Sequence, residues 1–258
     1  MTDSIDVKSN GKDQGLDESK KNFTDHLIEL RTRILRSLGA LFGIFLILFF
    51  FSDLIWEFFA APLLSNLPPQ GDMIATEPAS PFFAPLKLTI YTALFLGMPF
   101  ILHQTWSFIS PGLYNHEKKF AWPLMLMSVI LFYGGMAFAH IIVFPIVFKF
   151  MATVVPADII IMPDISRYLD FILKMFFGFG LAFQIPVATL LLAWSGLASA
   201  NSIAAKRPYA IIGCFILGMI LTPPDVISQL LLAFPCWLLF EIGIIAARLA
   251  EKPKDLSD

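Results

Sequence analysis

Charged residues are scarce in this sequence. Only 15% of its 258 residues are Asp, Glu, Lys or Arg, whereas a soluble domain carries about 25%. The formal net charge is −2, so the chain lacks the basic surface that nucleic-acid binding requires. The two cysteines, Cys214 and Cys236, both lie inside apolar runs. We therefore expect no disulfide framework and predict that both pack as small apolar residues.

Catalytic and metal-binding motifs are also missing. The four histidines show no HExxH or other paired spacing, and the sequence contains no GxSxG, GxGxxG or P-loop motif. We therefore expect no cofactor, no metal and no enzymatic activity. An intramembrane hydrolase remains an alternative without a supporting motif.

Hydrophobic residues make up 57% of the chain, with 27 phenylalanines and a mean hydropathy of +0.74. A helix needs about 20 apolar residues to cross a hydrocarbon core of ~30 Å. The sequence predicts an all-α membrane protein with one domain, residues 23–248. Its six transmembrane helices are expected at residues 34–59, 88–108, 120–148, 169–194, 208–222 and 226–246. The last two are predicted to be short, because Asp225 separates two brief apolar runs.

The flanking segments differ in character from these runs. Residues 1–22 hold acids and lysines without an apolar stretch and are predicted to be a disordered tail. Residues 249–258 are predicted to be a second tail. A short amphipathic helix is expected between Asn22 and Arg36, capped by Asn22 or Thr24 and carrying a Glu29–Arg33 pair at i,i+4.

The basic residues predict an orientation. Fourteen of the 18 Lys and Arg residues fall on the side that carries both termini, which places both termini in the cytoplasm. The two long loops on the other side, residues 60–86 and 149–168, are rich in proline. Because proline fixes φ, we expect these loops to form an ordered cap over the outer helix ends.

Polar residues inside the apolar runs are candidates for function. Gln184 lies in the fourth run, two residues before Pro186. Its amide is expected either to bond a carbonyl freed by Pro186 or to line a cavity for a partner helix or substrate. His140 is expected to be an interhelical donor, and Gln104, near the inner interface, is given no special role.

Two acids on the predicted inner side are a second candidate site. Glu117 follows the aromatic pair Trp106 and Phe108, and Glu29 lies beside Arg31. Either acid alone is typical of a solvated surface. Together, beside apolar surface, they suit guanidinium recognition, because a carboxylate accepts two hydrogen bonds from arginine.

Eight motifs resemble one family in order and spacing. They are His26–Arg31, Ala61–Leu63, Ser80–Phe83, Trp106–Ile109 with Leu113, Tyr114 and Glu117, Phe144–Pro145, Lys206–Tyr209, Leu221–Asp225 and Phe240–Gly243. Over about residues 23–248 the chain resembles TatC, the multispanning core subunit of the twin-arginine protein translocase.

The resemblance implies a concave, glove-like bundle of six helices in the bacterial inner membrane. It implies binding of the twin-arginine signal peptides of folded cargo, assembly in several copies with TatA and TatB, and use of the proton-motive force. The motifs assign signal-peptide binding to Glu29, Leu30, Arg31, Phe108 and Glu117. They assign partner-helix docking to Gln184, Met219, Thr222 and Gln229, and structural roles to Pro62 and Asp225.

One position departs from the family. Where the family often carries glutamate, this chain has Gln184, which cannot titrate. An obligatory proton-carrying role is therefore not expected there. A small-solute secondary transporter, with Gln184 and His140 at a midplane site, is the alternative that composition alone leaves open.

Overall fold

The computed structural model describes residues 6–64, 74–109, 118–154, 162–221 and 226–250. Within these ranges the chain is helical apart from short connections and one isolated bridge, between Ile74 and Asp164. The predicted all-α fold is confirmed for this part of the chain.

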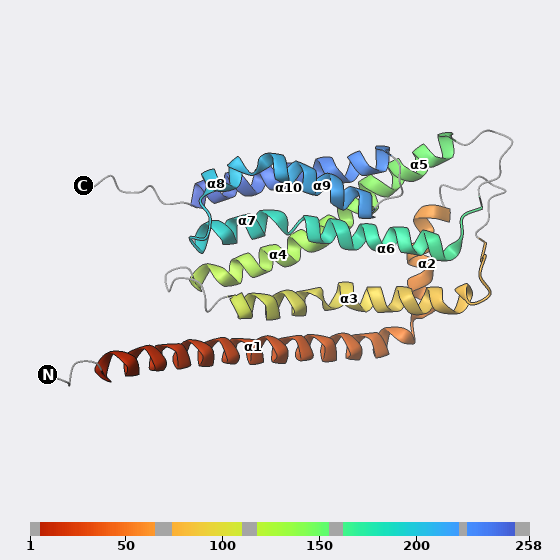
Figure 1. Ribbon diagram of the computed structural model, residues 1–258. Coiled ribbons are helices and arrows are strands. Elements are labelled where there is room, and N and C mark those ends of the chain that lie inside the picture. Colours follow the sequence, from red (N-terminus) through yellow and green to blue (C-terminus); the bar gives the residue numbers. More distant parts are fainter. Residues whose placement is uncertain (1–5, 65–73, 110–117, 155–161, 222–225, 251–258) are drawn as a thin grey trace.

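The long helices lie side by side, with α1 at one edge of the bundle and α9 and α10 at the other (Figure 1). We call the end where α1 begins and α10 ends the near end, and the opposite end the far end. The helices are α1 (Asp6–Phe49), α2 (Ser52–Leu64), α3 (Ser80–Ile109), α4 (Lys118–Phe138), a π-helical turn (Ala139–Val143), α5 (Phe144–Val154), α6 (Ile165–Ala182), α7 (Ile185–Trp194), α8 (Ala200–Ala205), α9 (Arg207–Leu221) and α10 (Val226–Ala250).

Five helical stretches in the described ranges are long and apolar enough to cross a membrane. They are His26–Phe49, Ser80–Ile109, Trp122–Phe150, Ile165–Trp194 and Gln229–Leu249. The apolar helix α9 has only 15 residues and would extend about 23 Å. These six elements correspond to the six predicted runs.

The first and the last predicted runs differ from the observed helices. The first run was expected to continue to residue 59, but α1 ends at Phe49 and α2 begins at Ser52. Ser52 and Asp53 favour a new helix start, because their side chains suit the exposed N–H groups and positive dipole there. The last helix was expected to be short, yet α10 has 25 residues. Arg248 in its last turn favours this length.

The N-terminal segment also differs from expectation. The helix α1 runs without a break from Asp6, through residues predicted to be a tail and past the expected cap at Asn22 or Thr24. Residues 6–22 contain two glycines but no proline, and nine of the 17 are Lys, Asp, Glu or Gln. Extending an existing helix costs less than nucleating one, so such a sequence can continue α1.

Phenylalanine dominates the core. Phe132, Phe144 and Phe179 are fully buried. Phe176 makes edge contacts with Phe144 and Phe59, at centroid distances of 5.0 and 5.5 Å. Such edge-to-face pairs stabilise beyond their burial. These contacts hold α2 and α5 against α6.

The described flanks of the two long loops meet at the far end. The backbone N–H of Ile74 donates to the carbonyl of Pro163 at 3.0 Å, and that of Ile165 donates to the carbonyl of Ile74 at 2.9 Å. The Asp164 carboxylate accepts bonds from the Thr76 N–H at 3.0 Å and hydroxyl at 2.6 Å. Residues 74–76 and 163–165 are therefore ordered against each other, whereas most of the remaining described residues of the two predicted loops belong to helices α2, α3, α5 and α6. The cap itself stays a prediction.

Asp164 makes this joint pH-dependent. Its hydrogen bonds with Thr76 lower its pKa from 3.8 to about 2. Because the folded pKa is depressed, its stabilising effect is complete above pH 3.8 and is lost as the pH falls toward 2. We expect the Asp164 carboxyl carbon to titrate by NMR near pH 2. In Thr76→Ala the titration midpoint of Asp164 should rise only part of the way toward 3.8, since its backbone N–H donors remain. An unchanged midpoint would contradict this assignment.

Candidate guanidinium-reading site at the near end

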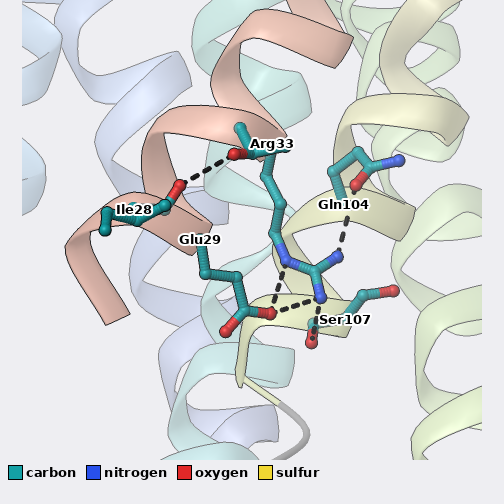
Figure 2. Close-up of polar contacts among 6 residues, drawn as sticks. Ile28, Glu29, Arg33, Gln104 and Ser107 are labelled. Atoms are coloured by element: carbon teal, nitrogen blue, oxygen red, sulfur yellow. Dashed lines mark hydrogen bonds and ion pairs between the residues drawn. The ribbon is translucent and has the colours of Figure 1, made fainter. Parts of the chain in front are cut away.

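The predicted signal-peptide site lies where α1 packs on the last turns of α3. Figure 2 shows the guanidinium of Arg33 between Glu29, on its own helix, and Gln104 and Ser107 of α3. Arg33 Nη2 and Nε donate to Glu29 Oε1 at 2.6 and 3.0 Å. Nη1 donates to Gln104 Oε1 at 3.3 Å, and Nη2 also donates to the Ser107 carbonyl at 3.1 Å. The predicted Glu29–Arg33 pair is therefore confirmed.

The Ser107 carbonyl needs this partner. It lies among the last carbonyls of α3, which have no helical donor. Four residues later stands Pro111, which has no N–H to offer. Arg33 supplies both the donor and the positive charge that stabilise a helix C-terminus.

Gln104 was wrongly given no role. Its side chain is 9% exposed, and a buried amide needs partners. Sequence spacing could not reveal this contact, because Arg33 and Gln104 are 71 residues apart. One feature of the sequence could have predicted the contact: a glutamine in the last turns of an apolar helix needs a hydrogen-bond partner from another helix.

Glu29 is only partly available to a ligand. Its side chain is 37% exposed, and its Oε1 atom accepts both bonds from Arg33. Oε2 accepts no hydrogen bond from the part of the chain that the structure describes. Arg31 and Arg36 are exposed on the same segment of α1. Among the described residues of this segment, the single carboxylate of Glu29 thus faces the guanidinium groups of Arg31, Arg33 and Arg36.

An apolar groove adjoins this network. It has a volume of about 240 Å³ and lies between Leu30, Ile34 and Leu38 of α1 and Ile101 and Phe108 of α3, with Arg33 and Gln104 in its wall. The ring of Phe108 stacks on His26 of α1, with centroids 4.2 Å apart. The structure thus brings Glu29, Leu30 and Phe108 together, whereas Arg31 does not line the groove.

The remaining predicted site residues are dispersed. Glu117, Thr222 and Asp225 lie outside the described residues, and for Pro62 the structure describes only its place in α2. Met219 on α9 is 64% exposed. Gln229 on α10 donates from Nε2 to the Phe215 carbonyl of α9 at 3.1 Å, so it joins the two last helices to each other.

Gln184 bonds a carbonyl, but not the one expected. Its Nε2 donates to the Ser128 carbonyl of α4 at 2.8 Å, rather than to a carbonyl freed by Pro186. The Ser128 hydroxyl accepts from Trp106 Nε1 at 3.1 Å, so a short polar chain links α3, α4 and Gln184. His140 stacks on Phe58 and Phe176. These intramolecular contacts do not favour a solute site built on Gln184 and His140.

Sequence reasoning also missed an ion pair between two of the family motifs. Arg207 Nε and Nη2 donate to Glu241 Oε1 and Oε2, both at 2.7 Å. This bidentate geometry is the stronger form of the arginine–carboxylate pair. It ties the start of α9 to α10 at the near end.

The role of Arg33 can be measured as stability. We expect Arg33→Gln to lower the free energy of unfolding by ~2 kcal/mol, because charge-assisted bonds across two helices are lost. The free energy of unfolding of Arg33→Lys should lie between those of the wild type and Arg33→Gln, since lysine keeps the charge but lacks the planar guanidinium group. Arg31→Gln, which removes an exposed arginine two residues away, is the control. Equal thermal midpoints for Arg31→Gln and Arg33→Gln in one detergent would contradict the network.

The described helices define a multi-pass α-helical membrane protein. Comparison with known proteins identifies the family. Residues 25–235 match the family model of the Sec-independent protein translocase protein (TatC). The chain is 58% identical over 219 residues to TatC of Azotobacter chroococcum, covering 85% of this chain and 86% of that protein. It is 47% identical over 231 residues to TatC of Escherichia coli K12, covering 90% of each.

A solved structure agrees with this result. A crystal structure of the twin arginine translocase receptor TatC superposes with a TM-score of 0.80 at 36% identity, covering 88% of this chain and all of that one. The chain therefore belongs to the TatC family and is a membrane-embedded component of the twin-arginine translocase. The family resemblance predicted from the motifs is confirmed.

Proposed function

We propose that the near end of this chain receives the twin-arginine signal peptides of folded proteins. In this proposal the groove between α1 and α3 takes the hydrophobic part of the signal peptide. Glu29 and Glu117 take its paired guanidinium groups. TatA and TatB then join the complex, in several copies, and export uses the proton-motive force.

The observation that carries the proposal is the way Arg33 is held. A carboxylate, an amide oxygen and a backbone carbonyl from two helices converge on one guanidinium group. Such acceptors suit arginine better than lysine, because the planar fork reaches several at once. The Oε2 atom of Glu29, which accepts no hydrogen bond from the described residues, lies beside this set and can accept from a guanidinium group of a ligand.

The apolar side chains of α1 support the second half of the proposal. Leu30, Ile34 and Leu38 recur every fourth residue, so they share one helix face. They are 37%, 50% and 55% exposed and line the groove. A hydrophobic segment that follows an arginine pair can pack on this face while its arginines stay at the rim.

On the charge balance of the described residues, we give the larger electrostatic role to Glu117. Glu29 is already paired with Arg33, and Arg31 and Arg36 repel an incoming cation. An exposed ion pair contributes only about 0–1 kcal/mol. A second carboxylate is therefore needed to favour two arginines, and Glu117 is the acid that the family motif places in the segment between α3 and α4.

Partner docking is proposed for the opposite edge of the bundle. Met219 is exposed on α9, and the 15 residues of α9 fall short of a ~30 Å hydrocarbon core. A short helix favours local thinning of the bilayer, which would lower the barrier to cargo. Met219, Thr222 and Gln229 are the docking residues we propose on α9 and α10, with Gln184 as a polar contact.

We further propose that the near end faces the cytoplasm of a bacterial inner membrane. The basic residues Arg31, Arg36 and Arg248 lie at this end. Lys and Arg residues gather on the cytoplasmic side of membrane proteins. Both termini would then be cytoplasmic.

Site-specific photocrosslinking in native membranes tests the proposal. A photoreactive amino acid at Phe108 should crosslink to a twin-arginine signal peptide, and one at Met219 should crosslink to TatA or TatB. Leu197, which is exposed on a short connection, is the control position and should capture neither efficiently. The proposal fails if Phe108 and Leu197 give equal yields of signal-peptide adduct.

A further inference from the structure

A second hollow, separate from the near-end groove, opens between α2, α3 and α4. Its volume is about 720 Å³, within the range of about 300–1,000 Å³ typical of ligand pockets. Its walls are almost entirely apolar. They include Leu54 and Phe58 of α2, Phe95 and Leu96 of α3, and Met136 of α4.

The polar atoms in these walls are already satisfied, with one exception. The Tyr133 hydroxyl donates to the Phe95 carbonyl at 3.0 Å, and the Thr92 hydroxyl donates to the Leu88 carbonyl at 2.8 Å. Glu57 also lines the hollow. Its exposed carboxylate makes no hydrogen bond or ion pair with the chain in the described ranges. The hollow thus presents an apolar wall and one unmatched negative charge.

The position of α2 at the far end, outside the candidate membrane spans, is where we expect a membrane surface. Figure 1 shows α2 running across the far end of the bundle, at an angle to the spanning helices. The helix Ser52–Leu64 contains Asp53 and Glu57 but no Lys or Arg. Lys87 of the neighbouring helix α3 is paired with Asp170, so it does not neutralise Glu57.

We propose that this hollow binds a phospholipid with a primary-ammonium headgroup. One acyl chain packs against α3 and α4, and the ammonium group donates to the carboxylate of Glu57. An apolar hollow that opens to a bilayer is filled by lipid chains, and the carboxylate at its edge selects among headgroups by charge. This inference is independent of the signal-peptide site.

Headgroup chemistry makes the selection specific. A primary ammonium group offers N–H donors to a carboxylate, and such charge-assisted bonds are stronger than neutral ones. A quaternary choline headgroup carries the same charge but no N–H donor. A glycerol phosphate headgroup is anionic and is repelled by Glu57. The expected order of binding is therefore phosphatidylethanolamine, then phosphatidylcholine, then phosphatidylglycerol.

Native mass spectrometry of the purified full chain tests the order. The protein, in a mild detergent, is mixed with equal amounts of the three lipids, all with palmitoyl and oleoyl chains. We expect wild-type protein to retain phosphatidylethanolamine roughly fivefold over phosphatidylglycerol. Glu57→Gln should abolish that preference. Asp53→Asn, which removes an acid one turn away that does not line the hollow, should keep it.

A second variant tests the hollow itself. Met136→Trp narrows it without changing its charge and should reduce retention of all three lipids at least twofold, while thermal midpoints report that each variant is folded. The proposal is overturned if wild-type protein shows no headgroup preference, or if Glu57→Gln keeps that preference. It is also overturned if Asp53→Asn loses the preference equally, or if Met136→Trp retains as much lipid as wild type.

Discussion

Glu117→Gln is expected to abolish export of folded proteins that carry a twin-arginine signal. The substitution keeps the size and hydrogen-bonding capacity of the side chain but removes its charge. Because Arg33 already pairs with Glu29, little negative charge remains to favour two incoming guanidinium groups. In our proposal the bound peptide shields these contacts from water, so losing charge-assisted bonds of ~1.5–3 kcal/mol corresponds to at least a tenfold loss of binding.

The measurement is the exported fraction of a folded reporter in cells whose only copy of the gene carries the substitution. Immunoblots of the membrane fraction should show normal levels of the variant. Glu77→Gln, which neutralises an exposed acid at the far end, is the matched control and should export normally. Normal export by Glu117→Gln would remove Glu117 from recognition.

Gly135→Ala is expected to disrupt the packing of α4 on α6. A Cβ atom at this position would overlap the backbone carbonyl oxygen of Phe179 and lie 2.8 Å from its carbonyl carbon. Backbone atoms cannot move aside as a side-chain tip can, so the two helices must separate. Overpacking of this kind costs ~1–3 kcal/mol, and rigid contacts reach the upper end of that range.

The neighbouring glycine provides the control. A Cβ atom at Gly134 would meet only the ring of Phe183, at 4.0 Å, which is ordinary contact. Alanine is a better helix former than glycine by ~1 kcal/mol, so Gly134→Ala should keep or raise the thermal midpoint. A Gly135→Ala protein as stable as Gly134→Ala would contradict the close α4–α6 contact.

The helical runs could be predicted from the sequence because hydrophobicity is a local property. Six apolar stretches are visible without tertiary information, and an i,i+4 pair such as Glu29–Arg33 follows from helical spacing alone. The break after Phe49 was missed because the apolar pattern continues through Phe50 and Phe51 into α2. Hydrophobicity alone does not register a change of helix direction.

Contacts between helices could not be predicted in the same way. The partners of Arg33 on α3 are 71 and 74 residues away, and Arg207 and Glu241 are 34 residues apart. Gln184 illustrates the limit. Its need for a hydrogen bond followed from burial, but the carbonyl that satisfies it belongs to Ser128, on a helix that local reasoning about Pro186 does not reach.

The central claim is that the carboxylates of Glu29 and Glu117 distinguish paired arginines from paired lysines. It is tested most directly by the Kd of purified protein for two synthetic signal peptides that differ only in an arginine pair replaced by a lysine pair. Wild-type protein should bind the arginine peptide at least tenfold more tightly, and Glu117→Gln should reduce this ratio toward one. Equal affinity of wild-type protein for both peptides, or a ratio unchanged by Glu117→Gln, would contradict the account.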